Sequence, residues 1–196
     1  MIRLFPAVLV TGISLWAGVA AAGVLKGTVS HAKGKLNLVV YVENAKATAA
    51  PGKTAKFNQK NMKFIPHVLP IAVGTKVAFL NNDGFDHNVF SPDNEGFDLG
   101  TFPGGEERTR TFDQVGVYAQ LCKLHPEMEG YIVVLPNRYF AKTGKNGSFT
   151  IKGIPNGKYE LKVWGKKLKA PDKERKFSAE VSDGKGTVAI DFSAGE

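Results

Sequence analysis

A nine-residue stretch, residues 120–128, reads Gln-Leu-Cys-Lys-Leu-His-Pro-Glu-Met and contains the only cysteine of the chain. It places a thiol, an imidazole and a thioether at Cys122, His125 and Met128. His87 supplies a second imidazole from a separate apolar segment. Two imidazoles and a thiolate, with a weak thioether beside them, form the ligand set of a blue-copper electron-transfer site. A fold that brings the two segments together would leave no coordination position open for a substrate.

Both segments follow strand-like runs. Residues 115–120 and 131–135 flank the cysteine loop, so its ligands are expected on a turn between two strands. His87 follows a strand-like run at residues 76–80 and a polar turn at residues 81–86. The alternative is that Cys122 is a small buried hydrophobic residue, as free cysteines often are.

These residues resemble the cupredoxins, and among them amicyanin and its periplasmic relatives. The resemblance is carried by His87-Asn88 and by Cys122-Lys-Leu-His125-Pro126-Glu-Met128, whose short His-Pro-x-Met spacing looks like amicyanin. It covers residues 54–135. It implies an all-β fold, a Greek-key β-sandwich with one type 1 copper ion at one end. The implied ligands are His87, Cys122, His125 and Met128.

The resemblance also implies roles for residues around the ligands. Asn88 ties the two ligand-bearing loops together by hydrogen bonding, and Pro126 restricts the loop. The imidazole edge of His125 lies in a small apolar patch with Leu124, which makes this patch the expected exit for the electron and the contact surface for a redox partner. Such a partner is a donor or acceptor protein, for example a cytochrome or a dehydrogenase.

Three further residues have less specific expectations. His31 lies in a turn-like segment and is expected to be solvated. His67, between Pro66 and Val68, is an additional copper candidate, although the ligand set is already complete. Met62 is expected to pack in the core on the same face as Phe64, and residues 91–109 are expected to form a loop.

The two ends of the chain predict a second, smaller sandwich. Residues 148–151 and 158–164 are strand-like and are joined by a Pro-Asn-Gly turn. They resemble the carboxypeptidase regulatory-like, or transthyretin-like, β-sandwich, in which an opening strand pair directly precedes this hairpin. Here residues 23–50 provide such a pair, and the copper segment intervenes. The expected domains are therefore residues 54–135, inserted into a sandwich made of residues 23–50 and 137–196. The alternative is that residues 23–44 belong to the copper domain and that the tail is an appendage.

Residues 1–22 read as a secretory signal, with Arg3, an apolar run and a small-residue site at Ala20-Ala21-Ala22. An uncleaved membrane anchor is the alternative. No other segment is apolar enough to span a membrane, so the mature chain is expected in the periplasm or otherwise exported. A single cysteine also excludes an intramolecular disulfide.

The formal net charge of +8 conceals an uneven distribution. Residues 81–130 are strongly acidic and residues 140–176 strongly basic. An acidic copper domain favours a cationic redox partner, and an exported copper protein is a poor candidate for nucleic-acid binding. The predicted function is a one-electron carrier. A copper buffer or chaperone and a metal-free interaction module are the alternatives. An enzyme is disfavoured because a multicopper oxidase or nitrite reductase needs further copper sites.

Overall fold

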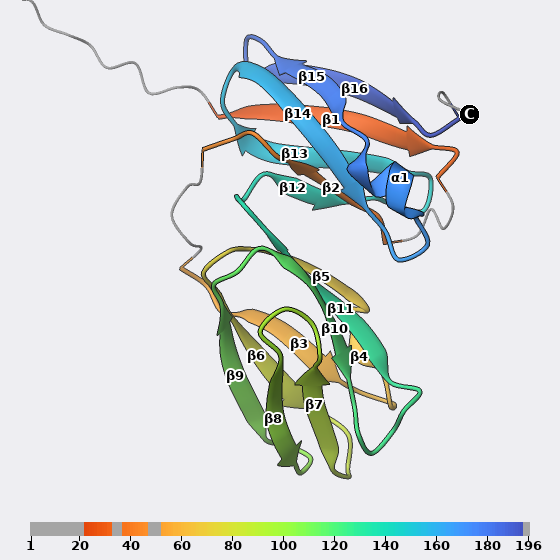
Figure 1. Ribbon diagram of the computed structural model, residues 1–196. Helices are drawn as coiled ribbons and strands as arrows, with labels where there is room; N and C mark the ends of the chain where they lie inside the picture. Colours follow the sequence, from red (N-terminus) through yellow and green to blue (C-terminus); the bar gives the residue numbers. More distant parts are fainter. Residues whose placement is uncertain (1–21, 33–36, 47–51, 194–196) are drawn as a thin grey trace, which may run out of the picture.

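The computed structural model of the protein describes residues 22–32, 37–46 and 52–193 (Figure 1). The expected signal segment, residues 1–22, lies outside the described residues apart from Ala22. The regular secondary structure of the described residues is almost entirely β-strand, and no helix among these residues is long and apolar enough to cross a membrane. The strands are β1 (Gly23–Ser30), β2 (Val39–Val42), β3 (Ala55–Gln59), β4 (Phe64–Ile65), β5 (Val68–Ala72), β6 (Thr75–Asn81), β7 (His87–Ser91), β8 (Phe97–Phe102), β9 (Glu107–Phe112), β10 (Gly116–Leu121), β11 (Glu129–Leu135), β12 (Phe140–Lys142), β13 (Ser148–Ile154), β14 (Gly157–Trp164), β15 (Phe177–Val181) and β16 (Lys185–Asp191), with one short helix, α1 (Ala170–Glu174).

The middle of the chain forms the lower sandwich of Figure 1. Its two sheets have the strand orders β5-β11-β10-β7-β8 and β4-β3-β6-β9. Aromatic rings fill the space between them: Phe57 packs edge-on against Phe79, and Phe112 against Tyr118, with all four side chains fully buried. The connections β6–β7 and β10–β11 both lie at the end of this sandwich that is farthest from the other strands (Figure 1).

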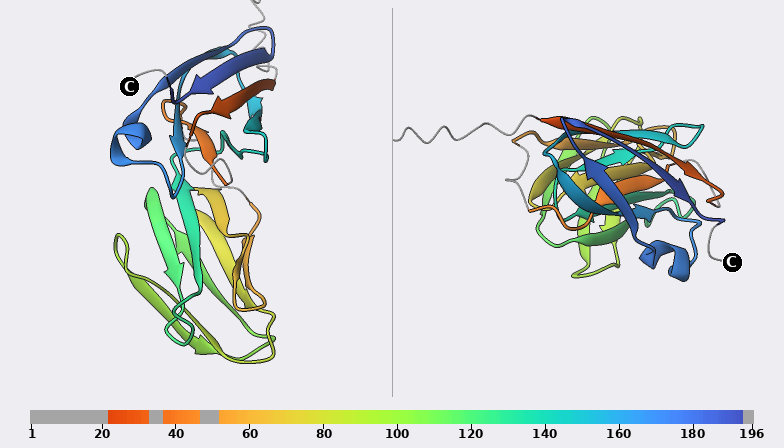
Figure 2. Two further views of the ribbon diagram at one scale, coloured as in Figure 1. Left: turned by 90° about the vertical axis from the view of Figure 1, so that its right-hand side faces the viewer. Right: turned by 90° about the horizontal axis from the view of Figure 1, so that it is seen from above.

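Both ends of the chain meet in the upper sandwich, whose sheets are β13-β1-β16 and β12-β2-β14-β15 (Figures 1 and 2). Strand β13 shows why these residues form strands, because Phe149 and Ile151 point into the core while the intervening residues are exposed. Strand β1 pairs with β13 and β16, and β2 pairs with β12 and β14. The N-terminal strands β1 and β2 therefore pair with strands from the C-terminal part of the chain and not with those of the lower sandwich.

The two sandwiches share a third apolar cluster. Strand β11 has four consecutive buried residues, a pattern typical of a strand covered on both faces. Ile132 and Val134 belong to the lower core, whereas Val133 and Leu135 pack with Val68, Val39 and Trp164 in the shared cluster. The ion pair between Lys166 and Glu129 lies beside it, and the Lys142 ammonium donates a hydrogen bond of 3.1 Å to the Val68 carbonyl. The sandwiches therefore pack against each other through an apolar cluster with polar contacts beside it.

Three local expectations were wrong. The Pro-Asn-Gly turn does not close a hairpin, because β13 and β14 lie in different sheets and each pairs with a strand from the N-terminal part of the chain. Residues 91–109 contain β8 and the first half of β9, in which Gly100 and exposed polar residues weakened the strand signal.

Met62 is 44% exposed and does not pack in the core. The alternation of β3 stops at a tight reversal, in which Lys60 and Lys63 exchange backbone hydrogen bonds of 3.0 and 3.2 Å. Asn61 and Met62 occupy the two central positions with φ of 53° and 52°. The chain reverses here, so Met62 points away from the face that its sequence spacing suggested.

Candidate metal centre

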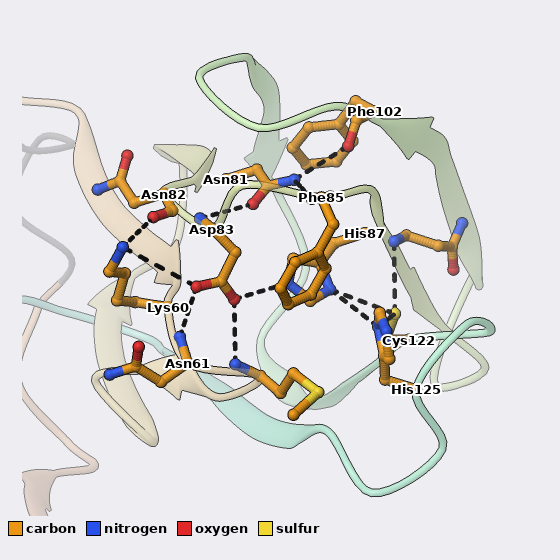
Figure 3. Close-up of polar contacts among 12 residues, drawn as sticks. Lys60, Asn61, Asn81, Asn82, Asp83, Phe85, His87, Phe102, Cys122 and His125 are labelled. Carbon is orange, nitrogen blue, oxygen red and sulfur yellow. Dashed lines mark hydrogen bonds and ion pairs between the residues drawn. The ribbon is translucent and has the colours of Figure 1, made fainter.

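Three side-chain donors converge at the far end of the lower sandwich (Figure 3). The Nδ1 atoms of His87 and His125 are 3.1 Å apart. The Sγ atom of Cys122 lies 4.0 Å from the first and 3.7 Å from the second. Within the part of the chain that the structure describes, these residues form the one group of three or more His, Cys, Asp or Glu side chains able to hold a metal ion.

Two strand connections position these donors. His87 is the first residue of β7, opposite Phe102 of β8. Strands β10 and β11 pair from Leu121 and Glu129 inward, so residues 122–128 form the connecting loop. This loop closes with a turn in which the Met128 N–H donates a 2.9 Å hydrogen bond to the His125 carbonyl. Pro126 takes the first central position of that turn, where its fixed φ is favourable.

Backbone and amide hydrogen bonds hold Cys122 in place. The Asn88 N–H donates to the buried Cys122 sulfur at 3.4 Å, and the Lys123 N–H donates to Asn88 Oδ1 at 3.3 Å. The Asn88 side-chain amide also donates to Asp98 at 2.8 Å. Hydrogen bonds from the Lys123 ammonium and the Gly100 N–H keep the pKa of the Asp98 carboxyl below its usual range. Asn88 thus links the β6–β7 and β10–β11 connections.

A buried carboxylate lies behind His87. Asp83 is 8% exposed, and its Oδ2 is 2.8 Å from His87 Nε2. Burial alone would raise the pKa of the Asp83 carboxyl, but hydrogen bonds from the Met62 N–H, from His87 and from the Asn61 N–H outweigh it and bring the pKa to about 2. The carboxylate can only accept, so the His87 proton is on Nε2 and the Nδ1 lone pair faces Cys122 and His125.

The outer side of the site is apolar. Phe85 is 46% exposed, and its ring contacts the rings of both His87 and His125, with centroids 5.1 and 5.6 Å apart. Leu124, beside half-buried His125, is 48% exposed. Met128 is buried in the same apolar cluster as Cys122.

The other two histidines make separate contacts. His31 is exposed and pairs with Asp191 at 2.7 Å on the upper sandwich. His67 is also exposed; its Nδ1–H donates to the Glu129 carbonyl at 3.0 Å and its ring edge meets Tyr131. Neither belongs to the group of converging donors.

Comparison with known proteins assigns the central segment. Residues 51–135 match the profile of the copper binding proteins of the plastocyanin/azurin family. This segment is a cupredoxin. No match was found among curated proteins.

Several solved structures are similar to the chain. One is a Cu-containing nitrite reductase from Thermus scotoductus SA-01, at 30% identity and a TM-score of 0.41, covering 47% of this chain and 25% of the reductase, so the chain spans about a quarter of that protein. Another is a purple cupredoxin from Nitrosopumilus maritimus, at 29% identity and a TM-score of 0.38, covering 41% of this chain and 98% of that one. A reduced amicyanin mutant gives 21% identity and a TM-score of 0.40, covering 48% and 97%.

The cofactor of the cupredoxin domain is copper, and the geometry fits one type 1 ion. The three converging atoms define a triangle whose centre is about 2 Å from each corner, close to metal–imidazole and metal–thiolate bond lengths. Imidazoles suit Cu(II) and sulfur favours Cu(I), so this donor set accommodates both oxidation states.

Sequence reasoning missed Asp83 and Phe85. Both lie in the polar turn at residues 81–86, which the sequence marks only as a loop. Asn81 shapes this turn, because its side chain donates to the Phe85 and Phe102 carbonyls and accepts from the Asp83 N–H. An aspartate four residues before a candidate histidine was a weak signal, since its burial depends on a distant turn.

Proposed function

We propose that this protein is an exported blue copper protein that carries single electrons, with His87, Cys122, His125 and Met128 as the ligands of one type 1 copper ion. The observation that supports this most directly is the convergence of two Nδ1 atoms and one Sγ atom within 4.0 Å of one another. Copper, when bound here, exchanges one electron by cycling between Cu(II) and Cu(I). The chain fixes the ligands through Asn88 and Asp83, and burial of His87, Cys122 and Met128 excludes water.

His125 is the proposed exit for the electron. It is half-buried, and the exposed side chains of Leu124 and Phe85 lie beside it. A redox protein, such as a cytochrome or a dehydrogenase, can bind to this apolar surface and displace its water without burying an unpaired charge. Exposed Asp86 and Glu127 adjoin it, so a cationic partner is favoured during encounter.

Copper storage or delivery would use the same ligands, but a storage protein has no need of an apolar exit surface at one ligand. The proposed carrier role also differs from catalysis, because four protein ligands leave no position for a substrate. The upper sandwich, which we propose is transthyretin-like and formed by residues 23–50 and 137–196, would then serve as a docking or supporting domain.

The test is the absorption and EPR spectrum of the copper-loaded protein. An intense visible thiolate-to-copper band is expected, and Cys122→Ser should abolish it because no other thiolate is present. His67→Ala is the matched control, since this histidine lies outside the donor group, and it should leave the band unchanged. A colourless wild-type protein with an ordinary tetragonal EPR spectrum would refute the proposal.

A further inference from the structure

Asp83 is a buried carboxylate that is not a proposed ligand but touches one. It joins three segments: its own β6–β7 turn, the imidazole of His87, and the reversal between β3 and β4 (Figure 3). Asn61 N–H donates to Oδ1 at 2.7 Å, and Met62 N–H donates to Oδ2 at 3.0 Å. The His87 Nε2–H shares Oδ2 at 2.8 Å.

The β3–β4 reversal is strained in a way that serves this carboxylate. Asn61 tolerates a positive φ, but a side chain as large as that of Met62 is rarely found at φ 52°. In this backbone conformation the N–H groups of Asn61 and Met62 both point at the Asp83 carboxylate, and together they form a concave anion-binding site. A strained backbone conformation persists only where surrounding contacts stabilise it, and here the hydrogen bonds to Asp83 provide that stabilisation.

The charge of Asp83 is poorly neutralised. The nearest cation is the Lys60 ammonium, 4.0 Å from Oδ1, and Lys60 also donates to the Asn82 carbonyl. Lys60 is about half exposed, so water screens its charge, whereas Asp83 lies inside the protein where electrostatic interactions are stronger. A net negative field therefore acts on the imidazole of His87.

We propose that Asp83 is a positioning residue that fixes His87 with Nδ1 toward the metal and lowers the reduction potential of the copper. This inference rests on the proposed function. A hydrogen bond from a ligand imidazole to a carboxylate increases the donor strength of the imidazole. Stronger donation and a nearby negative charge both stabilise Cu(II), and reduction, which removes one positive charge from the metal, becomes less favourable.

The test is Asp83→Asn in the full copper-loaded chain, which removes the charge and keeps the side-chain shape. We expect the blue band to be retained and the reduction potential to rise. The rise should correspond to at least a tenfold shift of the equilibrium toward Cu(I), or about 59 mV for one electron. Asp83→Glu should restore most of the original potential, because it restores the charge. A purely structural clamp would change the melting temperature of the apoprotein without this shift.

Asp98→Asn is the matched control. It removes one charge from a carboxylate that also lies close to the site, but Asp98 contacts Asn88 and Lys123 and no ligand ring. If Asp83→Asn alone is unstable, the substitution is made in a Met62→Gly background. Glycine accepts the positive φ at this position without strain, which preserves the fold. If Asp83→Asn in that background shifts the potential no more than Asp98→Asn does, Asp83 has no tuning role. A wild-type protein without a blue band would instead refute the proposed function.

Discussion

Met128 differs from the other three proposed ligands because a thioether is a weak donor that tunes the potential more than it holds the ion. Met128→Gln replaces sulfur by a harder amide oxygen, which favours Cu(II). We expect a lower potential, by at least a tenfold shift in preference toward Cu(II), or about 59 mV for one electron, with the thiolate band retained. Cyclic voltammetry measures the shift. Met62→Gln makes the same change at an exposed thioether outside the ligand set and should leave the potential unchanged.

The sequence alone suggests the four proposed ligands because residue type and spacing carry their chemistry, and the structure brings three of them, His87, Cys122 and His125, together. Asp83 could not, since its role depends on amides 21 and 22 residues earlier in the chain. Nothing in the local sequence marks Met62 for a positive φ, and a bulky residue there contradicts the usual turn preferences. The residues that orient a ligand were therefore harder to predict than the ligands themselves.

Strand β10 has an exposed aliphatic residue beyond each end, Val115 before it and Leu124 in the loop after it. Leu124→Glu adds a charge beside His125 at an exposed position, so its cost in folding stability should be small. We expect the electron self-exchange rate between oxidised and reduced copies to fall at least tenfold, with the copper spectrum nearly unchanged. NMR line broadening in mixed samples measures this rate.

Val115→Glu is the matched control, because it makes the same change on a side chain that is 53% exposed at the other end of the strand. It should leave the exchange rate nearly unaffected. Equal rates in wild type and Leu124→Glu would place the electron exit elsewhere.

A whole strand could be predicted where hydrophobic and polar residues alternate, as in β13. It could not be predicted where only hydrogen bonding to a partner strand holds the residues extended. Strand β8 has one fully buried side chain, Phe102, and is held by pairing with β7. The sheet to which a strand belongs was also hidden, because β13 and β14 follow each other directly yet pair with β1 and β2. Local sequence thus determines the alternation of a strand but not its neighbours.

At the scale of the whole molecule, the copper segment interrupts a sandwich built from both chain ends. If this arrangement is a single structural unit, removing residues 137–196 deprives β1 and β2 of all their partner strands. It also uncovers Val68, Val133 and Leu135 at the interface between the sandwiches. Each large aliphatic side chain that is newly exposed forfeits about 1.5–3 kcal/mol. The unpaired strands and this exposed apolar surface together favour association between chains.

The truncated protein is therefore expected to aggregate, which light scattering after size-exclusion chromatography will detect. A second truncation that retains only residues 52–136 is the control, because it removes the orphaned strands and leaves only the interface face exposed. We expect it to be more soluble than the first truncation, to melt below the full chain, and to keep the blue band. If the first truncation instead stays monomeric and binds copper as tightly as the full chain, β1 and β2 do not depend on the C-terminal strands, and the inserted-domain arrangement is wrong.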